Sequence, residues 1–218
     1  MASEASDRGL QIMTTVNEPF WDEGWFVPQQ TLDQELIAQL NFVPGLREAL
    51  VVRQVHALEH GTVWMLTEIA EQFPAEWRRG YAELGGMSTE KGFYLYGAVD
   101  KTDLYRAVAN AGDRLRSGEG NLAVHPRCGT NFSVTMFLTA GLAAGASWLL
   151  PKDPISQLVG MGTAAATAMA IAPEVGRYAQ RYLTTAIPFN LAIEEIEEST
   201  DWTGNQSHFV RLRWQDSQ

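Results

Sequence analysis

The sequence predicts an α/β (α+β) protein: a small cytoplasmic domain with a βαβ unit and a metal-site helix, joined to a two-helix transmembrane hairpin. Three observations lead to this fold class. Two long stretches carry no charge, two strand-like segments flank a helical pattern, and an HxxEH motif lies in a second helical pattern. The expected units are an acidic aromatic arm with a short helix (1–45), the α/β domain (46–130), the hairpin (131–185) and an acidic segment with an edge strand (186–218).

The composition argues against one class of function and indicates a compartment. The chain has 218 residues, with 26 acidic and 16 basic side chains and a formal net charge of −10 at pH 7. A nucleic-acid-binding surface must neutralise phosphates with Lys and Arg, so no nucleic acid is expected as a partner. The single cysteine, Cys128, cannot form an intramolecular disulfide, and the polar start of the chain lacks the apolar core of a secretory signal. We therefore expect most of the chain in a reducing compartment.

Two long uncharged stretches predict a pair of membrane-spanning helices. Twenty-four uncharged residues lie between Arg127 and Lys152, and twenty more lie between Asp153 and Glu174. Each stretch is long enough to cross a hydrocarbon core of about 30 Å as a helix, although the second is only weakly hydrophobic. The short turn PKDP between them predicts an antiparallel hairpin. The alternative is a helical hairpin buried in the core of a soluble protein.

Charged and small residues predict how this hairpin is oriented and packed. Arg127 and Arg177 flank its outer ends, whereas Lys152 stands in the turn. The positive-inside rule then places both termini in the cytoplasm, as in an integral protein of the cell's inner membrane or of the thylakoid membrane. The small-xxx-small spacings at 141–145 and 162–166 are expected to let the two helix backbones approach closely.

The remaining patterns predict short strands and helices on either side of the hairpin. In chain order these are a helix from Leu32, a helix over 46–72, a strand over 92–97, a helix from Asp100 or Thr102 to Ser117, a strand over 121–125 and an edge strand over 208–214. Strand, helix and strand with short connections predict a βαβ unit with parallel strands. His208, in the last strand, is expected to be a core side chain with its hydrogen bonds satisfied.

The motif His56-Ala-Leu-Glu59-His60 carries the strongest indication of chemistry. Residues four apart share one face of a helix, so both imidazoles can reach a single metal ion with Glu59 beside them. A structural His–Glu hydrogen-bond network and ligation of a porphyrin-type cofactor are the alternatives. A metal site needs a further protein ligand, and His125 and Cys128 both lie at the end of the expected second strand. The sequence leaves the choice between these two open.

The motif resembles the HxxEH element of the inverzincin metallohydrolases, in which two histidines hold zinc and the glutamate activates a bound water. It is also similar to the zinc site of S-ribosylhomocysteine lyase, which has two His ligands and one Cys ligand. That resemblance implies Zn²⁺ held by His56, His60 and Cys128, with Glu59 as the catalytic acid and base. The lyase family uses a second, catalytic cysteine, and because this chain has one cysteine the resemblance does not extend to that reaction.

A wider set of motifs, HALEH, GFYLYG and LAVHPRCGTN followed by the apolar hairpin, resembles a family of small uncharacterised membrane proteins. Its members occur mainly in cyanobacteria and filamentous green bacteria. The resemblance covers roughly residues 50–185 and implies an integral membrane protein, but it implies no activity. It places His56, Glu59, His60, His125 and Cys128 at recurrent motif positions.

Two functional hypotheses from different classes follow. The first is a membrane-anchored metal-binding protein, a zinc-dependent hydrolase or peptidase in which Glu59 activates a metal-bound water. The second is a non-catalytic subunit or assembly factor of a membrane complex, such as a photosynthetic one, in which the histidine cluster is structural or binds a pigment or haem. Expected partners are membrane lipid and a membrane protein complex, with a homo-oligomer as a further alternative.

Overall fold

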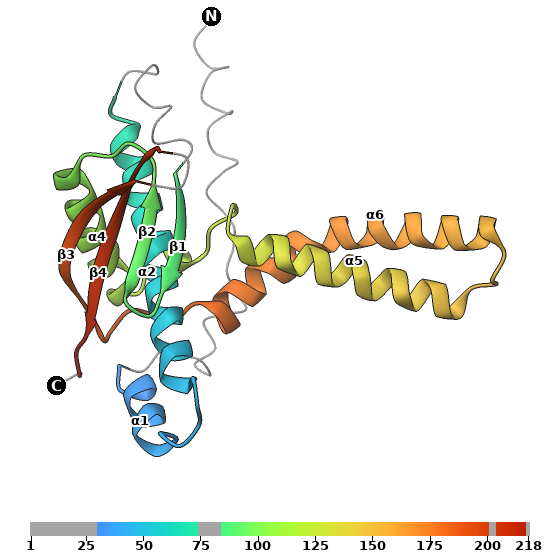
Figure 1. Cartoon of the computed structure of the whole chain (residues 1–218), viewed down its shortest axis with the longest axis horizontal. Helices are drawn as coiled ribbons and strands as arrows, with labels where there is room; N and C mark the ends of the chain where they lie inside the picture. Colours follow the sequence, from blue (N-terminus) through green and yellow to red (C-terminus); the bar gives the residue numbers. More distant parts are fainter. Residues whose placement is uncertain (1–29, 74–83, 201–203, 217–218) are drawn as a thin grey trace, which may run out of the picture.

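The computed structural model describes residues 30–73, 84–200 and 204–216. It has an α+β part, in which helices pack on a small sheet, and a long helical hairpin that projects away from it (Figure 1). The α+β class is therefore confirmed, with an antiparallel sheet. The aromatic arm expected in the first 29 residues lies outside the described residues.

The helices that hydrophobic spacing predicts are present, and one expected strand is replaced by a 3-10 turn. The elements are α1 (Leu32–Gln39), α2 (Leu46–Ala70), β1 (Gly85–Thr89), β2 (Gly92–Tyr96), α4 (Lys101–Arg116), η1 (Gly120–Ala123), α5 (Gly129–Leu149), α6 (Pro154–Ala179), η2 (Gln180–Thr184), β3 (Leu191–Thr200) and β4 (Gln206–Trp214). Of the two caps considered for α4, Asp100 is the one used: its carboxylate accepts from the backbone N–H groups of Thr102 and Asp103.

The four strands form one antiparallel sheet in the order β1-β2-β4-β3. The expectation that the last strand lies at an edge is wrong, because β4 pairs with β2 on one side and with β3 on the other. Its neighbour β3 contains the acidic run of the C-terminal segment, which was not predicted as a strand. A strand with one face in solvent can carry such charges, while Leu191 and Ile196 of β3 are buried in the core.

The expected parallel βαβ unit is also wrong, because residues 120–123 form the 3-10 turn η1 and β2 pairs only with antiparallel strands. A short apolar run does not distinguish a strand from a helical turn by its period. The backbone here pairs with side chains of α2 instead of a neighbouring strand. Trp64 Nε1–H donates to the carbonyl of Val124 at 3.0 Å, and His60 Nδ1 lies 2.6 Å from the carbonyl oxygen of Ala123.

The hydrophobic core lies between the sheet and the helices α2 and α4, which cover one of its faces (Figure 1). Its fully buried members come from both helices and from the sheet, and the largest are Leu66 and Met65 of α2, Leu104 of α4, and Phe93 and Leu95 of β2. Burying side chains of this size contributes about 1.5–3 kcal/mol each. This packing fixes α2, and with it the HxxEH motif, against the sheet.

Helices α5 and α6 form an antiparallel hairpin, and both are long and apolar enough to cross a membrane by length and composition. A row of small residues spaced by four on α6 is buried against α5: Gly160, Ala164, Ala168, Ala172 and Gly176. The expectation that 141–145 and 162–166 make this contact is wrong. A Cβ built on Gly141, Gly145 or Gly162 would meet no described atom within 4 Å, so these glycines face away from the partner helix.

A buried histidine in β4 generates a prediction about stability. His208 is 0 % exposed, which confirms its expected place in the core. Neither ring nitrogen has a hydrogen-bond partner among the described residues, so the expected hydrogen bonds are not found there. Burial lowers its pKa below the usual value. We predict that His208→Leu raises the free energy of unfolding by about 1–2 kcal/mol at pH 7.5, because it removes an unsatisfied buried polar group. Denaturant unfolding followed by tryptophan fluorescence measures this.

The same substitution should flatten the dependence of stability on pH. The unfolded chain binds a proton at this imidazole near pH 6.5, while the folded chain does so only at lower pH. The free energy of unfolding of the wild-type protein therefore falls as the pH drops below about 6.5, and that of the variant should fall less. Equal losses in the two proteins between pH 7.5 and 5.5 would contradict this assignment.

Candidate metal centre

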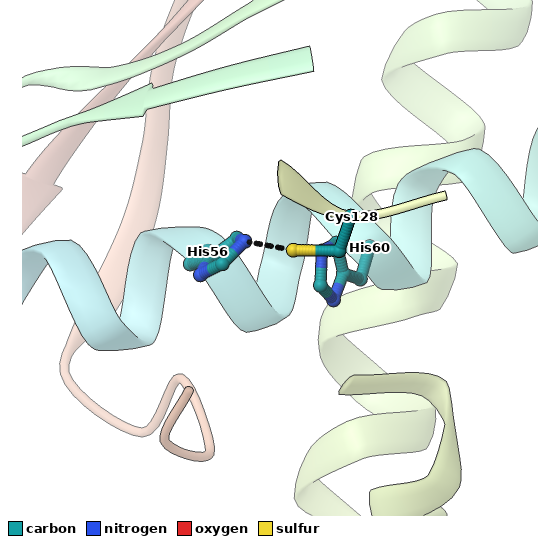
Figure 2. Close-up of side chains that lie close together, drawn as sticks. All are labelled: His56, His60 and Cys128. Atoms are coloured by element: carbon teal, nitrogen blue, oxygen red, sulfur yellow. Dashed lines mark hydrogen bonds between the residues drawn. The ribbon is translucent and has the colours of Figure 1, made fainter. Parts of the chain in front are cut away.

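Two histidines of α2 and the loop before α5 converge on one point. The ligand atoms of His56, His60 and Cys128 all lie within 4.8 Å of one another. Figure 2 shows both imidazoles projecting from α2, with the sulfur facing His56 and His60 close by. The Cys128 Sγ atom lies 3.2 Å from His56 Nε2. The structure thus brings together three of the residues that the sequence singled out.

Hydrogen bonds to backbone carbonyls fix the tautomer of both imidazoles. His56 Nδ1 lies 3.0 Å from the carbonyl oxygen of Thr184, and His60 Nδ1 lies 2.6 Å from that of Ala123. A carbonyl oxygen only accepts, so each Nδ1 carries a proton and donates it. In a neutral ring the lone pair is then on Nε2, which in His56 is the atom that meets Cys128 Sγ. Histidine ligands of metals typically donate their other ring N–H in this way.

Cys128 lies at the N-terminus of α5, where its thiol replaces the usual capping oxygen. The Thr130 backbone N–H donates to Sγ at 3.3 Å, so Cys128 is the N-cap of α5. Burial alone raises the pKa of the thiol, but the hydrogen bond and charge of His60 and the bonds from Thr130 outweigh it, so the pKa is below its usual value. The site therefore favours the thiolate, which is the form that binds metals.

Glu59 is buried between α2 and β1. Its Oε2 accepts a hydrogen bond from the Ser88 hydroxyl, and its Oε1 lies over Gly86, where a Cβ would come within 2.1 Å of that oxygen. Burial raises the pKa of this carboxyl, while the Ser88 bond and the charge of His56 oppose the rise. A carboxylate with a raised pKa is suited to accept and return a proton near neutral pH.

His125 lies beside the three-residue cluster but is committed to other contacts. Its Nδ1 accepts from the Arg127 backbone N–H at 3.3 Å, which places the ring proton on Nε2 in the neutral form. Burial, together with the charges of His60 and Arg127, lowers its pKa to about 4. Its ring centroid is 5.8 Å from that of His60. Between the two candidates for the third ligand, the geometry therefore favours Cys128.

Amide side chains from the hairpin hold the loop that presents Cys128. Gln180, which is fully buried, accepts from the His125 backbone N–H at 2.8 Å and donates to Asn131 Oδ1 at 2.8 Å. Asn131 in turn donates to the Pro126 carbonyl at 2.8 Å. Gly176 leaves room for this amide, because a Cβ there would lie 2.1 Å from Asn131 Oδ1. These bonds tie residues 125–128 to both hairpin helices.

The cluster opens into a cleft of about 310 Å³. The cleft is lined by Val52, His56, Glu59, His60, Val63, Leu84, Gly85, Gly86, Ser88, His125, Arg127, Cys128, Gly129 and Thr130. It therefore joins the three sulfur and nitrogen ligands, the Glu59 carboxylate, one side of β1 and the first turn of α5. Such a cleft can admit a small molecule or part of a polymer to the histidines.

Several contributors to the site were missed by sequence reasoning. Gly86 and Ser88 lie between the helix expected over 46–72 and the strand expected over 92–97, where no element was predicted, and nothing in the spacing linked them to the HxxEH motif. Thr184 contributes a backbone carbonyl, which no side-chain pattern can reveal. Gln180 follows the second apolar stretch, where a single polar residue gave no signal of a buried role.

Comparison with known proteins identifies relatives without an assigned activity. Residues 51–196 match the model of a domain of unknown function, DUF6391. The chain is also 72 % identical over 204 residues to an uncharacterised protein of Picosynechococcus sp., covering 94 % of this chain and 100 % of that protein. The prediction of an uncharacterised family with cyanobacterial members is confirmed. No solved structure matches the chain.

The close approach of Gly86 to Glu59 predicts that a methyl group added at position 86, but not one added at position 85, destabilises the fold. Gly86→Ala should lower the free energy of unfolding by about 1–3 kcal/mol, because its Cβ overlaps the carboxylate and forces Glu59 to move. Gly85→Ala is the matched control, since the nearest described atom to its Cβ is Tyr96 Cδ2 at 3.9 Å, an ordinary contact. Thermal unfolding of both variants tests this, and equal midpoints would contradict the packing described.

Proposed function

We propose that this chain, which belongs to the DUF6391 family of unknown function, is a membrane-anchored metal-binding protein and a zinc-dependent hydrolase. In this proposal His56, His60 and Cys128 hold Zn²⁺, and Glu59 transfers the protons. The observation that carries it is the convergence of the ligand atoms of His56, His60 and Cys128 within 4.8 Å of one another, with His56 Nε2 3.2 Å from the thiol sulfur and both Nδ1 atoms bonded to backbone carbonyls.

The donor set and its spacing fit zinc. Two imidazole nitrogens and a thiolate are ligands that zinc accepts, with bonds of about 2.1 Å to nitrogen and 2.3 Å to sulfur. Around a tetrahedral ion such bonds place ligand atoms about 3.3–3.6 Å apart. The 3.2 Å between Cys128 Sγ and His56 Nε2 is close to that separation, and all three atoms lie within 4.8 Å. A structural His–Glu network requires no such convergence with a thiol.

Three protein ligands, rather than four, are typical of catalytic zinc sites. A zinc ion in such a site lowers the pKa of a water molecule that it binds to about 7. Glu59 lines the same cleft, and its Oε2 is held by Ser88. Its carboxylate would take the proton from the attacking water and return it to the leaving group, a role that typically contributes 10²–10⁴-fold to the rate.

The hairpin supports the membrane anchor. Helix α5 spans 21 residues, which corresponds to about 31 Å and matches the hydrocarbon thickness of a bilayer. Large apolar side chains on it face outward, among them Phe137 at 79 % exposure and Trp148 at 83 %. Arg127 and Arg177 lie at the end next to the α+β part, which favours both termini in the cytoplasm. The metal site then lies at the membrane surface.

The single cysteine provides a direct test of zinc binding. We predict one zinc ion per chain in detergent-purified protein, and at least tenfold slower alkylation of Cys128 by iodoacetamide when zinc is restored after chelation. In His56→Ala and in His60→Ala, the bound zinc and the protection of Cys128 against alkylation should both be lost, because each variant removes a ligand. Elemental analysis and mass spectrometry of the alkylated chain provide the measurements.

His208→Ala is the control, since that imidazole is buried in β4 and is not part of the candidate metal cluster. It should bind zinc as the wild-type protein does. Equal zinc content in the wild-type protein and the His56→Ala, His60→Ala double variant would contradict the metal site. A purified protein that carries a coloured pigment or haem lost in the same variants would favour the alternative function.

Glu59→Gln separates a catalytic site from a structural one. The amide keeps the size of the side chain and an oxygen that accepts from Ser88, but it cannot accept the proton of water. We predict unchanged zinc content and a fall in hydrolytic turnover of at least 10²-fold. Turnover is measured on a pool of random 12-residue peptides and on small amides and esters. Loss of zinc or of folding with no effect specific to turnover would indicate a structural role.

A further inference from the structure

Strand β1 lies next to the candidate metal centre. It stands at one end of the sheet and, among the described residues, pairs with β2 alone. In Figure 1 it is the strand on the side of the sheet from which α5 and α6 project. Half of the backbone hydrogen-bonding groups of an edge strand point away from the sheet, so they are available to another extended chain.

The two edges of the sheet differ in how they are protected. The far edge, β3, carries four glutamates in ten residues, Glu194, Glu195, Glu197 and Glu198. Charged side chains of this kind are a common way to prevent a second strand from adding to an edge. Strand β1 has the sequence GGMST, with neither a charged residue nor a proline. Its edge therefore lacks the protection that β3 has.

The unprotected strand forms one wall of the cleft that contains the metal ligands. Gly85, Gly86 and Ser88 line this cleft together with His56 and Cys128. The Glu59 carboxylate is bonded to Ser88 and lies over Gly86, so the proposed proton acceptor is held by the strand itself. An extended peptide paired with β1 would run past both the Glu59 carboxylate and the cluster of His56, His60 and Cys128.

We infer that the substrate of this site is an extended polypeptide segment that adds to the free edge of β1 as a fifth strand. This inference rests on the proposed hydrolase function and names its substrate class. Backbone hydrogen bonds to β1 would bind peptides of many sequences, while Val52, Val63 and Leu84 offer apolar walls for alternate side chains. Because Gly129 and Thr130 of α5 also line the cleft, the segment would be one close to the membrane surface.

The chemistry requires only water as the second reactant. The oxygen of water adds to the carbonyl carbon of the peptide bond, and Glu59 takes a proton from that water. The C–N bond then breaks, the nitrogen receives the proton from Glu59, and a carboxylic acid and an amine are released. No oxidant, reductant or other co-reactant is consumed.

The experiment compares two lysine substitutions on opposite edges of the sheet. The zinc-loaded full chain in detergent is incubated with a pool of random 12-residue peptides, and new termini are identified by mass spectrometry. Met87→Lys places a charge on the exposed side of β1 and should lower kcat/KM for a cleaved peptide at least tenfold, with zinc content unchanged. Ser199→Lys, on the exposed edge of β3, should leave kcat/KM unchanged within twofold.

Hydrogen–deuterium exchange locates the bound peptide without relying on turnover. In zinc-loaded Glu59→Gln, a saturating amount of a cleaved peptide should slow amide exchange in 84–89 at least threefold and leave 191–200 unchanged. Cleavage without protection of β1 overturns the inference. Hydrolysis of small amides or esters with no peptide of the pool cleaved also overturns it, while the proposed hydrolase function survives. A chain that binds no zinc and hydrolyses nothing contradicts the proposed function, and this inference falls with it.

Discussion

The hydrogen bond from His56 Nδ1–H to the carbonyl of Thr184 joins the two parts of the molecule at the point where the candidate ligands meet. His56 stands in the middle of α2, while Thr184 ends η2, the last turn of the apolar hairpin. Arg53 donates to the neighbouring carbonyls of Tyr182 and Thr185. The last carbonyls of a helix have no partner within it, so these bonds satisfy groups that docking against α2 would otherwise bury unpaired. The tautomer of His56 thus depends on how the hairpin docks.

The polarity of the hairpin helices suits the chemistry of the groups at their ends. Helix α5 begins at the cluster, and its free N–H groups and positive dipole end favour a thiolate at Cys128. The second apolar helix ends at the cluster, where a carbonyl accepts from an imidazole. Gln180 and Asn131 connect the two ends through a hydrogen bond between their side-chain amides. A metal bound at the three ligands would therefore connect α2 to the hairpin and make zinc binding and hairpin docking interdependent.

Sequence reasoning succeeded where a feature depends on near neighbours along the chain. The periods of α2 and α4, the start of α4 at one of two candidate caps and the apolar hairpin follow from residues within a few positions of one another. It failed where a feature depends on pairing between distant segments. The run 121–125 was predicted as a strand but has no strand partner, and the acidic run of β3 was not predicted as a strand but pairs with β4. The glycines that contact the other hairpin helix could not be predicted either, because the rotation of a helix about its own axis depends on the helix it packs against.

The sequence by itself determined which chemical groups the protein brings to its site and their local spacing: two imidazoles one helical turn apart with a carboxylate beside them, and an uncharged hairpin just after the cysteine. Only the tertiary structure set Cys128 against His56, bonded both imidazoles to backbone carbonyls and placed β1 along the cleft. The physical reason is sequence separation. Cys128 meets His56 across 72 positions and Thr184 meets His56 across 128, and such contacts form only when the core packs.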